Sequence, residues 1–247
     1  MENHSSRPHL FGLLAGLFLA TGLCVASIVF TRTWTHLHES QVIDVTGSAR
    51  KNVQSDLAVW RASFAVEDEA LLSAHEKLKS DLGQVAAFLH AKGVKEFSLL
   101  PVQIREITAR VKGDDEERVT KRLGYRLIQR IEIKSSDIAT TTRLGTESAV
   151  LLEQGIALVS DGLEFIYTKA SEAKVEMMAE ATKDARARAE QIAGQGGRRI
   201  KELRTARMGV VQINPLYSSA TSWEGNNDTS SPEKTITTTV SATFALE

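Results

Sequence analysis

Cysteine is almost absent from this chain of 247 residues, in which Cys24 is the only one. A single thiol cannot close an intramolecular disulfide or supply a cysteine-based zinc site. Aromatic residues make up 6% of the sequence, too few for a platform on which single-stranded nucleic acid would stack. Lys and Arg (30 in total) nearly balance Asp and Glu (31), so the sequence lacks the basic excess of a general nucleic-acid-binding protein.

The longest continuous feature is an apolar run at residues 10–30, which contains no charged residue, proline, asparagine or glutamine. As a helix rising about 1.5 Å per residue, this run spans a hydrocarbon layer about 30 Å thick. A cleaved signal peptide usually has a shorter apolar core, of about 7–15 residues. The run therefore predicts an uncleaved transmembrane signal anchor, with cleavage after Ala26 or Ser27 as the alternative.

The flanks of this run say little about its orientation, because the charges on its two sides are nearly equal. A short tail before a single span favours an N-terminus inside the cell, so residues 1–9 are interpreted as a cytoplasmic tail. Trp34 is typical of the interface between membrane and water. We expect the helix to extend to about residue 40, with Cys24 at membrane depth.

Residues 41–247 mix the patterns of strands and helices. Alternating or short continuous apolar runs predict strands at residues 42–51, 56–67, 97–107, 124–134, 163–167, 200–213 and 235–246. Apolar residues three or four positions apart predict helices at residues 69–92, 137–154 and 171–193. The predicted fold class is α+β, with mostly antiparallel sheet and about three packed helices in the order ββαββαβαββ. A long loop is expected at residues 214–234.

The helix at residues 171–193 is the strongest of the three predicted helices. Its inward stripe is predicted to consist of Val175, Met178, Ala181, Ala185, Ala189 and Ile192. Because alanine is small, this helix can lie close against its neighbour. In the helix at residues 69–92, His75 lies one turn from Leu71 on the apolar stripe, so we expect a partly buried histidine.

No pattern in the sequence identifies a catalytic, cofactor-binding or metal-binding site. Ser48 with Lys51, and Ser171 with Lys174, match the Ser-x-x-Lys nucleophile motif of penicillin-binding enzymes. The companion motifs lack their defining residues, so a strand hydroxyl and a helix cap are the simpler interpretations. Four acids at residues 114–117 lack the spacing of a calcium loop and are interpreted as a solvated hairpin tip. We therefore predict no metal and no cofactor.

Several short motifs follow one another along residues 41–247, and their order and spacing together are more specific than any one of them. The first is the run VTGSA at residues 45–49, and the most specific is ATKDARARAEQIA at residues 181–193. Together with a Thr-rich closing strand, they resemble the SIMPL-domain family. The residues that carry the resemblance, with structural rather than catalytic roles, are Gly47, Asp56, Gly124, Tyr125, Asp184, Ala185, Arg186 and Ala189.

The resemblance to the SIMPL-domain family covers nearly the whole of residues 41–247. It implies a periplasmic or membrane-associated protein of the bacterial envelope, and it carries over no catalytic residue. Some members are implicated in oxidative-stress defence, and several are thought to form large homo-oligomers. Many members have a cleaved signal peptide, whereas this sequence predicts a retained anchor.

We therefore expect a non-catalytic periplasmic domain, tethered by one span to the bacterial inner membrane, that self-assembles and contributes to envelope or oxidative-stress defence. The expected partners are the inner membrane and further copies of the chain, with no nucleic acid. Edge strands at both ends of the domain motivate self-assembly, because an unpaired edge invites pairing with another chain. The alternative is an envelope hydrolase or ligand-binding enzyme whose site has no recognisable motif.

Overall fold

The computed structural model describes residues 8–38, 41–112 and 118–247 of the chain. Helix α1 (Pro8–His38) contains the long apolar run. Its segment Gly12–Trp34 has a mean hydropathy of 2.4 and is long and apolar enough to cross a membrane. The predicted apolar N-terminal helix is thus confirmed. The predicted cytoplasmic tail falls mostly on residues 1–7, which lie outside the described residues.

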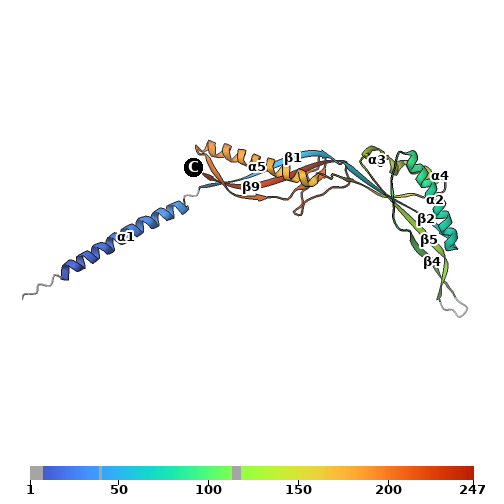
Figure 1. The fold of residues 1–247 in the computed structure, drawn as a ribbon, viewed down its shortest axis with the longest axis horizontal. Helices are drawn as coiled ribbons and strands as arrows, with labels where there is room; N and C mark the ends of the chain where they lie inside the picture. The colour runs from blue at the N-terminus through green and yellow to red at the C-terminus, as the bar shows by residue number, and fades with distance from the viewer. Residues whose placement is uncertain (1–7, 39–40, 113–117) are drawn as a thin grey trace, which may run out of the picture. The chain divides into compact units, whose positions relative to one another are not determined.

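The contacts within the chain divide it into two compact units, each assembled from separated stretches of sequence. Unit 1 takes residues 1–48, 180–209 and 239–247, and unit 2 takes residues 49–179 and 210–238. The elements after α1 (Figure 1) are, in chain order, β1 (Val42–Gln54), β2 (Leu57–Asp68), α2 (Leu71–Ala91), β3 (Ser98–Leu99), β4 (Gln103–Lys112), β5 (Arg118–Ser135), α3 (Ile138–Glu147), α4 (Val150–Glu153), β6 (Val159–Ile166), α5 (Ala170–Gln195), β7 (Ile200–Met208), β8 (Gln212–Pro215) and β9 (Glu233–Leu246).

Unit 2 is built on an antiparallel sheet with the strand order β3-β5-β2-β6, in which β4 also pairs with β5. β2 and β5 lie side by side with Trp60 opposite Ile133 and Val66 opposite Leu127. Because side chains alternate across a strand, these residues share one face of the sheet. Helices α2 and α3 cover that face (Figure 1) and bury all four residues in one apolar core.

A second, smaller apolar cluster of unit 2 lies where β8 pairs antiparallel with β9. Ile213 of β8 stands opposite Ile236 of β9, and both are almost fully buried. Ala173 and Met177, in the first part of α5, complete the buried part of this cluster. The N-terminal half of α5 is therefore held by a cluster that is separate from the large core around Trp60.

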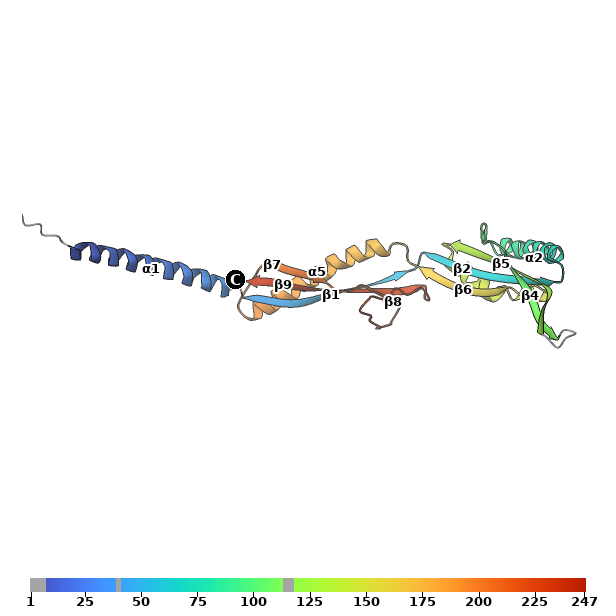
Figure 2. The ribbon, with the colours of Figure 1, turned by 90° about the horizontal axis from the view of Figure 1, so that it is seen from below.

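In unit 1, β9 is the middle strand, with β1 on one side and β7 on the other (Figure 2). β7 runs antiparallel to β9, and its ladder is regular from Thr205, opposite Thr243, to Met208, opposite Val240. Ala185 and Ala189 of α5 pack on one face of this sheet, in a cluster with Val45, Ala242 and Phe244. Helix α5 covers only this face of the three strands and leaves their opposite face without contact to it.

The predicted α+β class with antiparallel sheets is confirmed, with differences inside some elements. The predicted helix at residues 137–154 is two helices, α3 and α4. The break follows from local hydrogen bonding at Ser148, whose hydroxyl donates to the Gly145 carbonyl at 3.0 Å. The next amide, of Ala149, bonds three residues back to Thr146, which tightens the turn and ends α3.

Two predictions about helix faces were wrong. Val175 and Ile192 of α5 are 63% and 56% exposed, because the helix faces its sheets with a different row, which consists mostly of alanine. This row is Ala173, Met177, Ala181, Ala185, Ala189 and Ala193. His75 of α2 is exposed, because the neighbouring row that begins at Ala74 is the one that enters the core.

Candidate functional site

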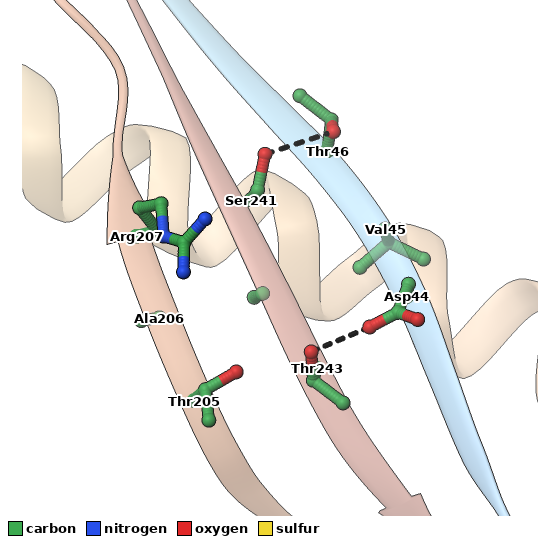
Figure 3. A pocket seen from close by; sticks show the side chains of 9 residues that line it. Asp44, Val45, Thr46, Thr205, Ala206, Arg207, Ser241 and Thr243 are labelled. Carbon is green, nitrogen blue, oxygen red and sulfur yellow. Dashed lines mark hydrogen bonds between the residues drawn. The ribbon is translucent and has the colours of Figure 1, made fainter.

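The uncovered face of unit 1 carries a shallow polar groove of about 470 Å³. Alternation along β9 directs Val240, Ala242 and Phe244 into the protein and leaves Ser241 and Thr243 on the opposite face. Figure 3 shows the groove with α5 behind the strands. The lining residues come from three strands: Asp44, Val45 and Thr46 of β1, Ser241, Ala242 and Thr243 of β9, and Thr205, Ala206 and Arg207 of β7.

Two hydrogen bonds join β1 to β9 across the groove (Figure 3). The Thr243 hydroxyl donates to the carboxylate of Asp44, and the hydroxyl oxygens of Thr46 and Ser241 lie 3.3 Å apart. Arg207 extends over the groove from the other side strand. The face thus offers hydroxyl groups in the middle, a carboxylate at one edge and a guanidinium at the other, an arrangement suited to polar contacts.

The motif residues of unit 1 hold α5 against β1. Gly47 is buried where the strand crosses the helix, and a Cβ at this position would collide with the backbone of Ala181 and Ala185. The amide of Ser48 donates to the carboxylate of Asp184 at 2.7 Å. This backbone hydrogen bond, together with Arg188, lowers the pKa of Asp184 below its ordinary value. The glycine and the aspartate therefore fix the same crossing.

Three other motif residues belong to the same helix. Ala185 and Ala189 are fully buried against the sheet, so their small size sets the distance between helix and strands. Arg186 points away from this contact and pairs with Glu190 at 2.9 Å, one turn along the helix. An exposed ion pair of this kind contributes little to stability.

The motif residues of unit 2 lie at two other contacts, one between Asp56 and Thr168 and one between Gly124 and the end of β2. Asp56 accepts hydrogen bonds from the amide and the hydroxyl of Thr168, at 2.8 and 2.7 Å, and these bonds lower its pKa. Gly124 is buried beside the end of β2, where a Cβ would lie 2.6 Å from the Asp68 carbonyl oxygen. Tyr125 packs its ring against the large core, with Arg122 5.1 Å from the ring centre. The motif residues thus make separate structural contacts and do not gather in one site.

In the Ser48 and Lys51 pair, the lysine side chain is bound by an acid of α5. The ammonium of Lys51 lies 2.6 Å from the carboxylate of Glu176. That hydrogen bond raises the pKa of Lys51 above its ordinary value. A lysine that accepts a proton from serine needs a lowered pKa instead. This arrangement favours the simpler interpretation of Ser48 as a strand residue that meets α5.

Lys234 is a buried charge that the sequence interpretation placed in a loop. Its side chain is 1% exposed, and its ammonium donates to the backbone carbonyl and, at 3.0 Å, to the carboxylate of Asp228. Burial raises the pKa of Asp228, but the bonds from Ser230 and Lys234 outweigh it and the net shift is downward. The sequence contained a signal for this burial, because Lys234 lies two residues before Ile236 and therefore on the same inward side of β9.

The segment before Lys234 is tied down by side-chain amides of β8 and of the loop itself. Gln212 bonds to the backbone of Ser222 and Asn226, and Asn214 bonds to the Ala220 carbonyl at 2.7 Å. Trp223, between these ties, remains 85% exposed. The predicted long loop is therefore closely hydrogen-bonded to unit 2 although it forms little regular structure.

The model of the SIMPL family, described as a protein of unknown function (DUF541), matches residues 43–244. The chain belongs to the SIMPL family. No curated protein matches the sequence. Within residues 8–38, 41–112 and 118–247, no three His, Cys, Asp or Glu side chains are grouped as metal ligands. The acids at residues 114–117 lie outside the described residues.

Proposed function

We propose that this SIMPL protein is a non-catalytic, membrane-tethered module of the bacterial envelope that assembles with further copies of itself. The observation that carries the proposal is the sheet of unit 1, which ends in an edge strand on each side and follows directly after an apolar helix. Edge strands expose backbone groups that pair readily with another chain. Tethering confines copies to one surface and raises their effective concentration.

The proposed location is the bacterial inner membrane, with the SIMPL domain in the periplasm. Helix α1 supplies the single span, and the short segment before it stays in the cytoplasm. The balanced charge flanking the span does not choose between orientations, so the proposal depends on the family resemblance. A protease added to intact spheroplasts should degrade the SIMPL domain. A cytoplasmic control protein should survive, and protection of the SIMPL domain would contradict the proposed orientation.

Self-assembly is tested by the mass of the detergent-solubilised full-length protein. Light scattering, corrected for detergent, should give a mass of several chains that falls when the protein is diluted. A single-chain mass at every concentration would contradict self-assembly. Particle imaging of the same sample gives the number of copies. A contribution to oxidative-stress defence is part of the proposal and predicts reduced survival under peroxide when the gene is deleted.

The enzymatic alternative makes a different prediction. A hydrolase that used the Ser48 and Lys51 pair would lose activity on Ser48→Ala while the fold is retained. Under the non-catalytic proposal, the same substitution leaves both assembly and survival under peroxide unchanged, because the amide of Ser48, not its hydroxyl, binds Asp184. Loss of either property in a folded Ser48→Ala protein would favour the enzyme.

A further inference from the structure

The two side strands of the unit 1 sheet have free outer edges. The strand order is β1-β9-β7, so each side strand pairs with β9 alone in the part of the chain that the structure describes. Every residue of β7 after Ile200 is exposed, and the ladder to β9 is regular from Thr205 to Met208. A free edge of this kind presents backbone N–H and C=O groups to a strand of another chain, in parallel or antiparallel direction.

The directions of β1 and β7 determine whether a contact between two copies is parallel or antiparallel. Asp44 meets Thr243 and Thr46 meets Ser241, so residue numbers fall along β9 as they rise along β1. β1 is therefore antiparallel to β9, and β7 is antiparallel to β9 as well. It follows that β1 and β7 are parallel to each other. A second copy placed beside the first, in the same orientation, continues the sheet with a parallel contact.

The membrane anchor favours this parallel contact. β1 begins at Val42 and α1 ends at His38, so at about 3.6 Å per residue the start of β1 lies within about 14 Å of the end of the helix. A parallel contact keeps the anchors of all copies on the same side of the assembly. An antiparallel contact between two β7 edges or two β1 edges would turn one copy end for end.

Charge complementarity also favours the pairing of β7 with β1. Arg207 lies at one edge of the groove face and Asp44 at the other (Figure 3). Neither has an ion-pair partner among the described residues, and Asp44 accepts one hydrogen bond, from Thr243. When β7 of one copy lies beside β1 of another, the two side chains share a face as direct or diagonal neighbours. Diagonal neighbours across strands are about 7–8 Å apart, within reach of arginine.

We propose that β7 of one copy pairs in parallel with β1 of a second copy, and that Arg207 of the first forms an ion pair with Asp44 of the second. The inference rests on the self-assembly proposed above and identifies the surface that performs it. The contact is heterologous, since each copy contributes a different edge. Such a contact repeats from copy to copy and closes into a ring when the rotation between copies allows it.

The charges are tested by exchanging them in the full-length protein in detergent. Arg207→Glu and Asp44→Arg should each raise the concentration needed for assembly about tenfold or more, because each places like charges at the seam. The combined variant should recover assembly. Arg204→Glu is the matched control, since Arg204 lies on the same strand and pairs with Glu202 of its own chain. Asp44→Arg combined with Arg204→Glu should show no recovery.

The edges are tested by disulfide formation in a Cys24→Ser background. Asp44→Cys and Thr205→Cys, introduced together, place one thiol on each edge at the level of Thr243, so that oxidation can link neighbouring copies. Within one chain the two positions lie on strands on either side of β9, about 9.6 Å apart, beyond the usual limit of about 7 Å for a disulfide. Oxidation of the double variant should therefore give a ladder of linked chains.

The outcomes separate this inference from the function on which it rests. A protein that is a single chain at every concentration removes the proposed self-assembly and this inference together. An oligomer in which the double-cysteine variant gives no ladder, or in which charge exchange fails to recover assembly, overturns the β7–β1 contact alone. Linked dimers from Thr205→Cys by itself would show pairing between two β7 edges, which also overturns it.

Discussion

The two units of this SIMPL protein bury very different side chains. Unit 2 encloses Trp60, Phe64 and a set of Leu and Ile residues between a sheet and two covering helices. The equivalent contact in unit 1 contains Ala185, Ala189 and Ala242, with Val45 and Phe244 as its larger members. A core of large side chains is stabilised by the apolar area that it buries. A core of alanines depends on how closely helix and strand backbones approach, which is why Gly47 lies at the crossing.

The largest effect is expected from Trp60→Ala in unit 2. Trp60 is fully buried and donates its indole N–H to Ser160 at 2.9 Å. Removing the ring leaves a cavity, so the free energy of unfolding should fall by about 3–5 kcal/mol. Trp223→Ala, at an exposed position in the same unit, should change it by no more than about 0.5 kcal/mol. Urea unfolding of both variants in detergent measures the difference, and equal effects would contradict the assignment of the core.

A comparable loss is expected from Lys234→Met, which leaves the carboxylate of Asp228 without its buried partner. Breaking a buried ion pair by removing one member costs about 3–5 kcal/mol. Adding Asp228→Asn should recover part of this loss, because the unpaired charge is then gone. Lys51→Met is the control, since its ion pair with Glu176 is exposed and should leave the urea midpoint nearly unchanged. No recovery in the double variant would mean that the charge is not the cause.

Gly47→Val tests the close packing of unit 1. The new side chain would collide with the backbone of α5, so we expect a loss of about 1–3 kcal/mol. Gly194→Ala is the matched control, because Gly194 lies in α5 with open space around it and alanine favours helices by up to about 1 kcal/mol.

The same variant shows whether the two units unfold separately. Trp60 and Trp223 both lie in unit 2, and the remaining tryptophan, Trp34, lies in α1. If the units are independent, Gly47→Val should shift the far-UV circular dichroism transition more than the fluorescence of Trp60. Coincident shifts of the two signals would show that the units unfold as one.

The smallest effect expected is on the pH dependence of stability. The pKa values of Asp184 in unit 1 and Asp56 in unit 2 are lowered by hydrogen bonds from backbone amides. Each carboxylate therefore contributes stability that is fully present above its unfolded pKa of about 4 and is lost as the pH falls through the lower folded value. Asp184→Asn and Asp56→Asn should each flatten the loss of stability between neutral and acidic pH. An unchanged pH profile would contradict the role of that carboxylate.

Much of the fold was readable from local patterns, and the exceptions have physical causes. The alternation in residues 235–246 correctly predicted which side of β9 faces the protein, because neighbouring side chains of a strand must point in opposite directions. The predicted inward stripe of α5 was correct at Ala181, Ala185 and Ala189, which are fully buried, and wrong at Val175 and Ile192, which are exposed. The helix instead turns its alanines to the sheets, since only small residues fit the close approach at Gly47.

The candidate site was less predictable than the fold. The sequence identifies Gly47 and Asp184 as motif residues but predicts no contact between their segments. The structure places both at one crossing of α5 and β1. The groove on the opposite face combines Asp44, Arg207 and Ser241, which are far apart in sequence and share no motif. No local signal links such residues, because their proximity depends on the order of strands in the sheet.

The sequence by itself determined the apolar helix, the α+β class and the family, since each depends on local composition, on periodicity or on the order of short motifs. Tertiary structure alone decided that the chain forms two units, that the buried Lys234 pairs with Asp228, and that β1 and β7 are the two side strands of the unit 1 sheet. These properties depend on which distant segments meet. A pattern within one segment records how that segment alternates or coils, but the partner against which it packs is chosen by the fold as a whole.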